Sequence, residues 1–191
     1  MATSSLVPID LISNKYRVDP FIVPNIQRID NIREFLDDPN IFNGDINPLV
    51  DRLDSEYKQC YSIVQLLKEE VIEQNVLLDQ VKKSMLALQD QVKMSDAGQR
   101  FLVDREKILV QFSDETEITE CNVPAALELY SLKMGKLYVK ILALDTDIDF
   151  VTYLRNVSLI NRDYVKNWYN KAEEQHENVN ILSNNPENIT K

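Results

Sequence analysis

A heptad repeat of apolar residues dominates the first half of the chain. With Tyr57 at position a and Cys60 at position d, apolar residues recur through Val92, and only Gln74 interrupts them. A repeat that keeps its register over five heptads is typical of a coiled coil, because ordinary core helices seldom run so far. The a and d residues are Tyr57, Cys60, Val64, Leu67, Val71, Gln74, Leu78, Val81, Met85, Leu88 and Val92.

Proline and glycine positions set the limits of the helix that carries this repeat. Asn47 suits a helix cap and Pro48 the first helical position, and the next proline is Pro124. The sequence therefore predicts one long stalk helix over residues 48–112, about 98 Å long at 1.5 Å per residue. A bend in this helix near Gly98 stays open.

The segments on either side of the stalk are expected to lack long helices. Residues 1–47 contain several prolines and predict an extended segment with one short helix at 29–38. Residues 113–123 are acidic and contain no lysine or arginine, so they predict a solvated connection.

The last third of the chain predicts two shorter helices. Pro124 opens the first, and Asp-Thr-Asp at 145–147 predicts a tight turn before the second. Thr146 or Asp147 is expected to cap the second helix, which runs to about residue 176. Together they would form an antiparallel helical hairpin over 124–177, the headpiece, before a flexible tail at 178–191. The expected fold is all-α, with one very long coiled-coil helix followed by this hairpin.

The composition supports an all-α fold and disfavours binding of nucleic acid or anionic membranes through a basic patch. The chain has only three glycines, which disfavours turn-rich β and α/β folds, and a net charge of −10 without a basic run. Direct binding to nucleic acid or to an anionic membrane through a basic patch is therefore disfavoured. No apolar run approaches 18 residues and the N-terminus lacks a signal-peptide layout, so we expect a cytoplasmic protein.

The sequence contains no recognisable catalytic or metal-binding motif. Cys60 and Cys121 are far apart, and the single histidine, His176, lies in a polar stretch, so neither a zinc site nor a disulfide framework is expected. Carboxylate pairs such as Glu69 and Glu70 are expected on solvated helix faces, where nothing would raise their pKa. We expect no enzymatic activity, no cofactor and no metal.

The predicted stalk is longer than the rest of the chain can cover. A hairpin of roughly 30–45 Å would leave at least half of the apolar seam exposed, and a lone helix is marginal in water. We therefore expect partner chains on both parts. The expected partner-binding residues of the stalk are Tyr57, Val64, Leu67, Val71, Leu78, Val81, Met85, Leu88, Val92, Leu102 and Leu109, and those of the headpiece are Leu137, Ile141, Phe150, Leu154, Val157, Tyr164 and Trp168.

The order of three segments resembles a known family. They are "REFLDDPNIF" (33–42), "LLKEEVIEQNVLLDQVKKSMLALQDQV" (66–92) and "DIDFVTYLRNVSLINRDYVKNW" (147–168). This order is similar to that of the Mod(r) domain in the vacuolar protein sorting 37 family, a subunit of the endosomal complex ESCRT-I. The resemblance covers about residues 29–172. The positions that match the family's last helix are Asp147, Asp149, Phe150, Tyr153, Arg162 and Tyr164.

The resemblance implies a scaffold subunit. Its long helix would join a stalk with helices of other ESCRT-I subunits, and its hairpin would join a headpiece. The implied partners are the ubiquitin-binding E2-variant subunit, the subunit 28-type hairpin protein and a further stalk subunit. The complex sorts ubiquitinated membrane cargo into multivesicular bodies, so this chain would reach the cytosolic face of endosomes, and the membrane, through the complex.

A second interpretation belongs to another class of protein. The heptad repeat alone also suits a self-associating coiled-coil adaptor of a tethering, motor or kinetochore-type assembly. The repeat does not distinguish a homodimer from a heteromeric complex.

Overall fold

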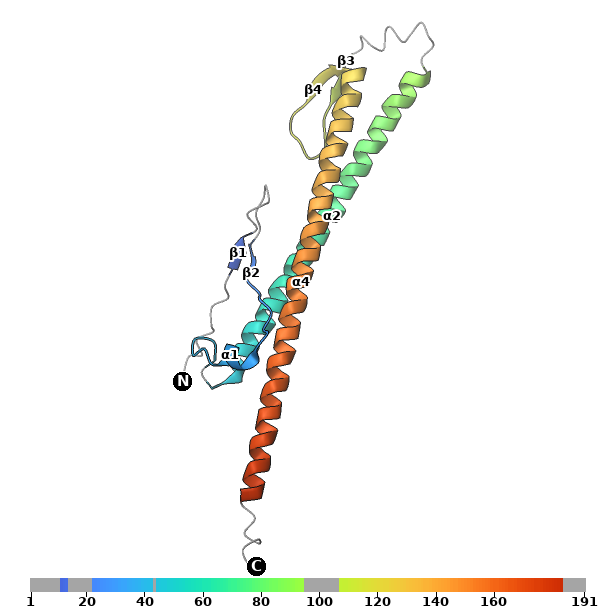
Figure 1. Ribbon diagram of the computed structural model, residues 1–191. Helices are drawn as coiled ribbons and strands as arrows, with labels where there is room; N and C mark the ends of the chain where they lie inside the picture. Colours follow the sequence, from blue (N-terminus) through green and yellow to red (C-terminus); the bar gives the residue numbers. More distant parts are fainter. Residues whose placement is uncertain (1–10, 14–21, 43, 95–106, 184–191) are drawn as a thin grey trace, which may run out of the picture. The chain divides into compact units, whose positions relative to one another are not determined.

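The structure is a computed structural model that describes residues 11–13, 22–42, 44–94 and 107–183 (Figure 1). Most of this part of the chain is α-helical, which confirms the predominantly helical fold. The elements in chain order are β1 (Leu11–Ser13), β2 (Ile22–Pro24), α1 (Ile32–Leu36), α2 (Ile46–Met94), β3 (Lys107–Val110), β4 (Thr119–Asn122) and α4 (Val123–Ser183).

The chain divides into two compact units. Unit 1 comprises Met1–Val64 and Phe150–Lys191, and unit 2 comprises Gln65–Asp149. Helices α2 and α4 each contribute one part to either unit, so both units are built on the same two helices.

Unit 1 has its core where α1 meets the two long helices. Its buried residues are Ile29, Ile32, Leu36, Leu49, Leu53 and Val165. The two helices run antiparallel here, because Ser158 Oγ on α4 donates to the carbonyl of Leu53 at 2.8 Å while Val165 joins the cluster with Leu49, farther back along α2. The short helix α1 is capped by Asn31, whose side chain accepts from the backbone N–H groups of Arg33 and Glu34.

A buried amide fastens the chain that precedes α1. Asn161 is 2% exposed, its Oδ1 accepts from the backbone N–H of Ile29 at 3.0 Å, and its Nδ2 donates to the carbonyl of Gln27 at 2.7 Å. Both groups of the amide are therefore used. Nearby, Arg162 on α4 pairs with Asp54 on α2 at 2.9 Å. Asn161 and Arg162 of α4 thus fix the positions of α2 and of the segment before α1 relative to α4 in unit 1.

Unit 2 has a smaller core between its parts of α2 and α4. The buried residues Leu78 and Val81 meet Leu137, and partly buried side chains surround them, among them Phe112 and Tyr130. The helices are again antiparallel, because the Glu70–Lys140 ion pair (3.0 Å) and the Met85–Ser131 contact (3.9 Å) progress in opposite directions.

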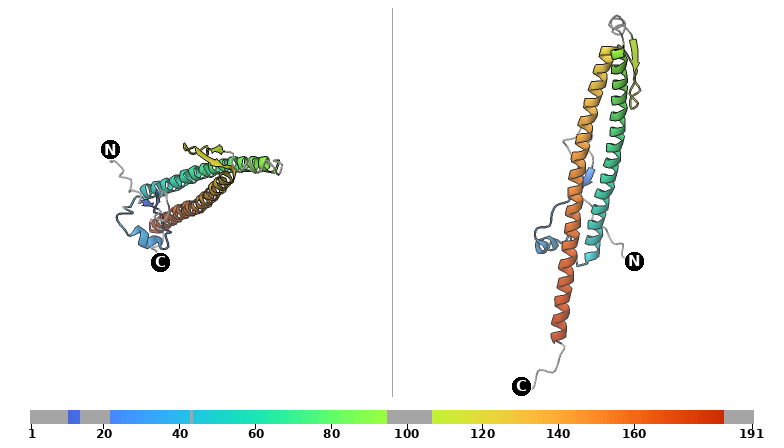
Figure 2. Two further views of the ribbon diagram at one scale, coloured as in Figure 1. Left: turned by 90° about the horizontal axis from the view of Figure 1, so that it is seen from above. Right: turned by 90° about the vertical axis from the view of Figure 1, so that its right-hand side faces the viewer.

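A two-stranded ribbon completes unit 2. Strands β3 and β4 pair antiparallel with Ile108 opposite Cys121, and Figure 2 shows the ribbon beside the first turns of α4. The Asn122 side chain accepts from the backbone N–H of Ala125 at 3.0 Å and caps α4. This cap explains why the helix begins at Val123, one residue before the predicted start.

Three predicted boundaries are wrong. The stalk helix does not reach residue 112: α2 ends at Met94, and residues 107–110 form a strand. The helical hairpin over 124–177 does not form either, because α4 is one helix of 61 residues that continues through 145–147 and past the predicted tail boundary at 178.

Each difference has a physical cause. The run of Ile108, Leu109 and Val110 is rich in β-branched residues, which favour a strand when a partner segment is available. At the expected turn there is no glycine or proline, and Thr146 Oγ1 donates to the carbonyl of Leu142 at 2.9 Å within the helix. Asp147 is buried at 5% exposure instead of capping a new helix.

The continuous α4 changes how the seam of α2 is covered. We expected at least half of that seam to stay exposed, but Leu78 and Val81 pack with Leu137 of α4 in unit 2. The seam residues that are buried within the chain are Cys60, Val64, Leu67, Gln74, Leu78 and Val81. A helix of 61 residues extends about 92 Å, far more than the predicted hairpin. Tyr57, Val71, Met85, Leu88 and Val92 of the seam are only half-buried, and their contact with partner chains stays a prediction.

A pair of leucines on α2 tests the core of unit 2. Leu78 is 3% exposed and Leu86 is 53% exposed. Leu78→Ala should lower the free energy of unfolding by about 2–5 kcal/mol because it leaves a cavity, whereas Leu86→Ala should change it by no more than about 0.5 kcal/mol. Urea denaturation followed by circular dichroism measures both, and equal effects of the two substitutions would contradict the packing described.

The two cysteines should differ in reactivity. Cys60 is fully buried and Cys121 is half-buried. Burial raises the pKa of the Cys60 thiol to about 11, with the charge of Glu56 acting in the same direction and that of Arg155 opposing it. At pH 8, Ellman's reagent should therefore react rapidly with Cys121 alone and reach Cys60 only in denaturant.

The same pKa predicts a pH dependence. The unfolded thiol titrates near 9.0 and the folded one near 11, so the contribution of Cys60 to stability should fall as pH rises through this range.

The control for the reactivity experiment is the Cys121→Ser variant, in which no rapid reaction with Ellman's reagent is expected. Rapid modification of a thiol in that variant would mean that Cys60 is accessible.

Candidate partner-binding surfaces

Four of the eleven predicted stalk residues lie inside the chain's own core. Their side chains are covered by other residues of this chain and offer no area to a partner, which differs from the prediction. The buried members of the predicted set on α2 are Val64, Leu67, Leu78 and Val81.

The other predicted stalk residues keep some exposed area. Leu109 is 71% exposed, but it lies on strand β3 and not on a stalk helix. Leu102 lies outside the described residues. The half-buried members of the set are Tyr57, Val71, Met85, Leu88 and Val92.

The predicted headpiece residues divide in the same way. Leu137, Leu154 and Val157 are buried, and half-buried Ile141 packs against the core of unit 2. Trp168 packs against the core of unit 1 beside Val165, so the largest side chain of the segment is a packing residue. The two that remain exposed, at 37% and 38%, are Phe150 and Tyr164.

A second apolar series on α4 points away from its buried side. Leu132 is 56% exposed, Val139 70% and Leu142 69%, with spacings of seven and three residues. We call these three residues the outer stripe of α4. Leu132 and Val139 follow the core-facing Tyr130 and Leu137 by two positions, which turns them about 200° around the helix.

The outer stripe is absent from the predicted contact residues, because one apolar face was assigned to residues 124–144. The signal was present as a second heptad phase, displaced by two residues from the first. Large aliphatic side chains grouped on an exposed face are characteristic of protein interaction sites. The outer stripe is therefore the best candidate for partner binding in unit 2.

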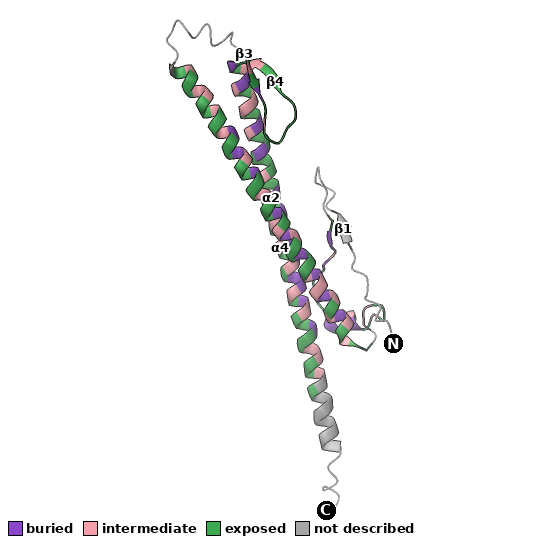
Figure 3. Cartoon of the chain, turned by 180° about the vertical axis from the view of Figure 1, so that it is seen from behind, coloured by how far each residue is buried: buried purple, intermediate pink, exposed green. Residues whose placement is uncertain are grey.

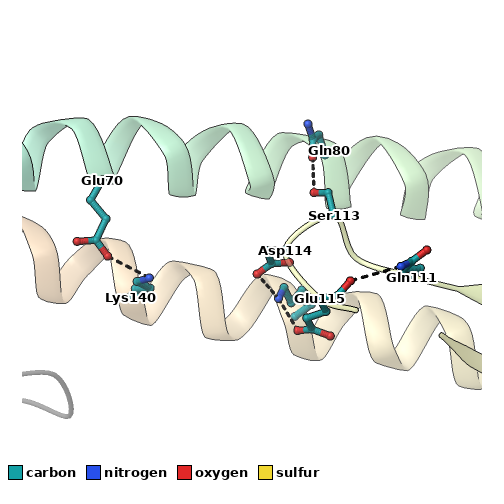
Figure 4. Close-up of polar contacts among 8 residues, drawn as sticks. Glu70, Gln80, Gln111, Ser113, Asp114, Glu115 and Lys140 are labelled. Atoms are coloured by element: carbon teal, nitrogen blue, oxygen red, sulfur yellow. Dashed lines mark hydrogen bonds and ion pairs between the residues drawn. The ribbon is translucent and has the colours of Figure 1, made fainter. Parts of the chain in front are cut away.

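A buried lysine holds the loop of the ribbon against α4. Lys133 Nζ donates to Asp114 Oδ2 and to Glu115 Oε1, both at 2.6 Å, and lies 5.2 Å from the ring centroid of Phe112. Figure 4 shows the two carboxylates together with Ser113, whose Oγ donates to Gln80 Oε1 on α2 at 2.9 Å. The acidic segment predicted as a solvated connection is thus tethered to both helices.

The charge state of Lys133 follows from its surroundings. Burial lowers its pKa, but the hydrogen bonds and negative charges of Asp114 and Glu115 outweigh burial, so that the pKa is raised above 10.5. A lysine protonated throughout the neutral range cannot act as a base or nucleophile there. The cluster of Lys133, Asp114 and Glu115 therefore has a structural role, which is to hold the loop against α4.

The described residues offer neither a metal site nor a charged ligand pocket. No group of three or more His, Cys, Asp or Glu side chains lies close enough to hold a metal ion in the part of the chain that the structure describes. A cavity of about 210 Å³ in unit 1 is lined by Ile29, Phe35, Leu49 and the Arg52–Glu56 ion pair. These two charges pair at 3.1 Å, so the charged side chains that line the cavity neutralise each other.

Replacing Lys133 tests whether its ion pairs with Asp114 and Glu115 stabilise the chain. Lys133→Met should lower the free energy of unfolding by about 1–3 kcal/mol, because the buried charge-assisted bonds are lost while the half-exposed carboxylates return to water. Lys136→Met, three residues along α4 at an exposed position, is the control and should have little effect. Similar losses in both variants would contradict a specific role for Lys133.

The pH dependence of this difference has a defined sign. Because the pKa of Lys133 is raised in the folded chain, its contribution is complete below pH 10.5 and is lost as pH rises through the folded-state pKa. The stability difference between the wild-type chain and Lys133→Met should therefore be constant near neutrality and shrink above about pH 10.5. Chemical denaturation of both proteins over this range measures it.

Comparison with known proteins leaves the family open. No helix in the described part of the chain is both long and apolar enough to cross a lipid bilayer. No protein-family model, no curated protein and no solved structure matches this chain. The resemblance to the vacuolar protein sorting 37 family therefore stays a prediction from the sequence.

Proposed function

We propose that this chain is a structural scaffold subunit of a heteromeric protein complex and contributes binding surfaces to it. The observation that carries the proposal is the outer stripe of α4, where Leu132, Val139 and Leu142 are exposed at heptad spacing. Burying such side chains typically contributes about 1.5–3 kcal/mol each. A partner helix that packs on the stripe would gain this stabilisation without disturbing the core of unit 2.

Unit 1 offers exposed side chains of its own. On its part of α4, Tyr153 is 61% exposed and Ile160 52%, and the predicted partner-binding residues Phe150 and Tyr164 also keep exposed area. Aromatic side chains are enriched at protein interfaces because they bury a large area and lose little conformational entropy. We therefore retain Phe150 and Tyr164 as proposed contact residues.

The specific complex that we propose is ESCRT-I. Its support is the order of sequence segments that resembles the Mod(r)-domain subunits, together with the long helix α2 and the short helix α1 before it. The continuous α4 departs from the family's hairpin, so the proposed contacts are the exposed faces and not a headpiece hairpin. In this role the chain would work in the cytoplasm and reach endosomal membranes through its partners, in the sorting of ubiquitinated cargo.

A self-associating coiled-coil adaptor is the second candidate. The continuous α4 favours it, because an unbroken helix with two heptad phases can pack on α2 with one face and on a second copy with the other. The two candidates differ in the mass of the isolated chain. A homodimer supports the adaptor, whereas a 22.2 kDa monomer that assembles only with other proteins supports the heteromeric scaffold.

The experiment that tests the proposal is co-expression with the other ESCRT-I stalk subunits. We expect a stoichiometric complex by size-exclusion chromatography with light scattering. A chain that stays monomeric in the presence of these subunits would overturn the ESCRT-I assignment, and a stable homodimer would overturn the heteromeric scaffold.

A substitution in the outer stripe tests which surface is used. Val139→Glu should reduce co-purification of the partner at least about tenfold, because it places a charge in a dry contact, while the thermal unfolding of the isolated chain stays unchanged. The control is Ser84→Glu, which adds the same charge at an exposed position of α2. Normal assembly of Val139→Glu would show that the partner binds elsewhere.

A further inference from the structure

The outward face of α2 in unit 2 combines aliphatic and acidic side chains. Leu66 is 65% exposed, Ile72 64% and Val76 52%. Between and beside them, Glu69 and Glu73 are exposed as well. We call these five residues the acidic face of α2. The exposed positions of the helix are drawn green in Figure 3.

This face lies opposite the side of α2 that packs in the core. Glu69 follows the buried Leu67 by two positions, and Val76 follows the buried Gln74 by two, which turns each about 200° around the helix. Substitutions on the acidic face therefore leave the core of unit 2 untouched.

The carboxylates of the face are available for a partner. Within the described residues, neither Glu69 nor Glu73 forms an ion pair or hydrogen bond through its side chain. The neighbouring Glu70 behaves differently, because it lies nearer α4 and pairs with Lys140 at 3.0 Å (Figure 4). The lysine that α4 supplies thus neutralises Glu70 and leaves the two outward carboxylates unmatched.

The aliphatic and acidic side chains of this face determine which class of partner can bind to it. Aliphatic side chains spaced six and four residues apart can pack against the apolar stripe of another helix, and the flanking carboxylates favour lysine or arginine beside that stripe. Anionic lipids and nucleic acids would be repelled by the same carboxylates. A second copy bound by two-fold symmetry would bring the Glu69 and Glu73 carboxylates of one copy close to those of the other, which is unfavourable.

We propose that the acidic face of α2 binds a basic amphipathic helix of a partner protein. This inference rests on the proposed scaffold function and adds the chemical class of one partner. It uses another helix and other residues than the outer stripe of α4, so the two surfaces can be tested separately.

The probe is a pair of synthetic helical peptides of about 18 residues. Both carry the same leucine stripe, flanked by lysines in one peptide and by glutamates in the other, and both carry a fluorescent label. Fluorescence anisotropy with the full chain should show at least about tenfold tighter binding of the lysine peptide at low salt, and this preference should shrink as salt is added.

Variants of the chain locate the binding. The double substitution Ile72→Ser and Val76→Ser should weaken binding of the lysine peptide at least about tenfold. The control is Leu86→Ser, at an exposed position of α2 outside both proposed surfaces, and it should leave binding unchanged. Glu69→Lys with Glu73→Lys should reverse the preference, so that the glutamate peptide binds more tightly. All these positions are exposed, and circular dichroism should show unchanged folding.

Several results would overturn the proposal. They are equal affinity for both peptides, no saturable binding of the lysine peptide up to about 100 µM, and unchanged binding to the Ile72→Ser and Val76→Ser variant. A homodimer that dissociates on Ile72→Ser would also overturn it, by making a second copy the occupant. Because the peptides are tested on the isolated chain, failure here is distinguishable from failure to assemble with the ESCRT-I subunits.

Discussion

An amphipathic helix is stable in water only where another surface covers its apolar side, and in this chain α4 provides that surface for α2. Leu49 and Leu53 meet Val165 in unit 1, and Leu78 and Val81 meet Leu137 in unit 2. Every other feature depends on this antiparallel pairing. The ribbon, the short helix α1 and the buried polar contacts are all attached to a pair of helices that would be marginal alone.

Polar residues at core-facing positions of α4 decide how the remaining segments attach to this pair. Asn161 holds the backbone at Gln27 and Ile29, and Lys133 holds the acidic loop through two carboxylates. Each would be costly to bury without partners, so each requires one particular segment beside it. The apolar seam stabilises the helix pair, and these polar contacts specify what packs against it.

The sequence was informative where the structure is local and less so where it depends on distant contacts. Asn47 and Pro48 predicted the start of α2 within two residues, and Pro124 that of α4 within one. By contrast, Asp147 was predicted as a helix cap but lies buried in a continuous helix. The burial of Lys133 depends on the distant acidic loop, which places two carboxylates beside it, and the sequence analysis made no prediction for it. Of the predicted stalk contact residues, Val64, Leu67, Leu78 and Val81 are buried within the chain itself, and contact of the half-buried others with a partner stays a prediction. Exposed residues such as Val139 belong to a second heptad series on α4, which is not found when only one apolar face is assigned to the helix.

The claim that α2 and α4 of one chain cover each other can be tested directly by chemical cross-linking of mixed isotopes. Glu70 and Lys140 pair at 3.0 Å, so a zero-length carbodiimide reagent should join them. When ¹⁴N- and ¹⁵N-labelled chains are unfolded together, refolded and cross-linked, mass spectrometry should find this peptide pair only with both halves carrying the same label. Pairs that mix the two labels, or the absence of the Glu70–Lys140 cross-link, would contradict the intrachain pairing.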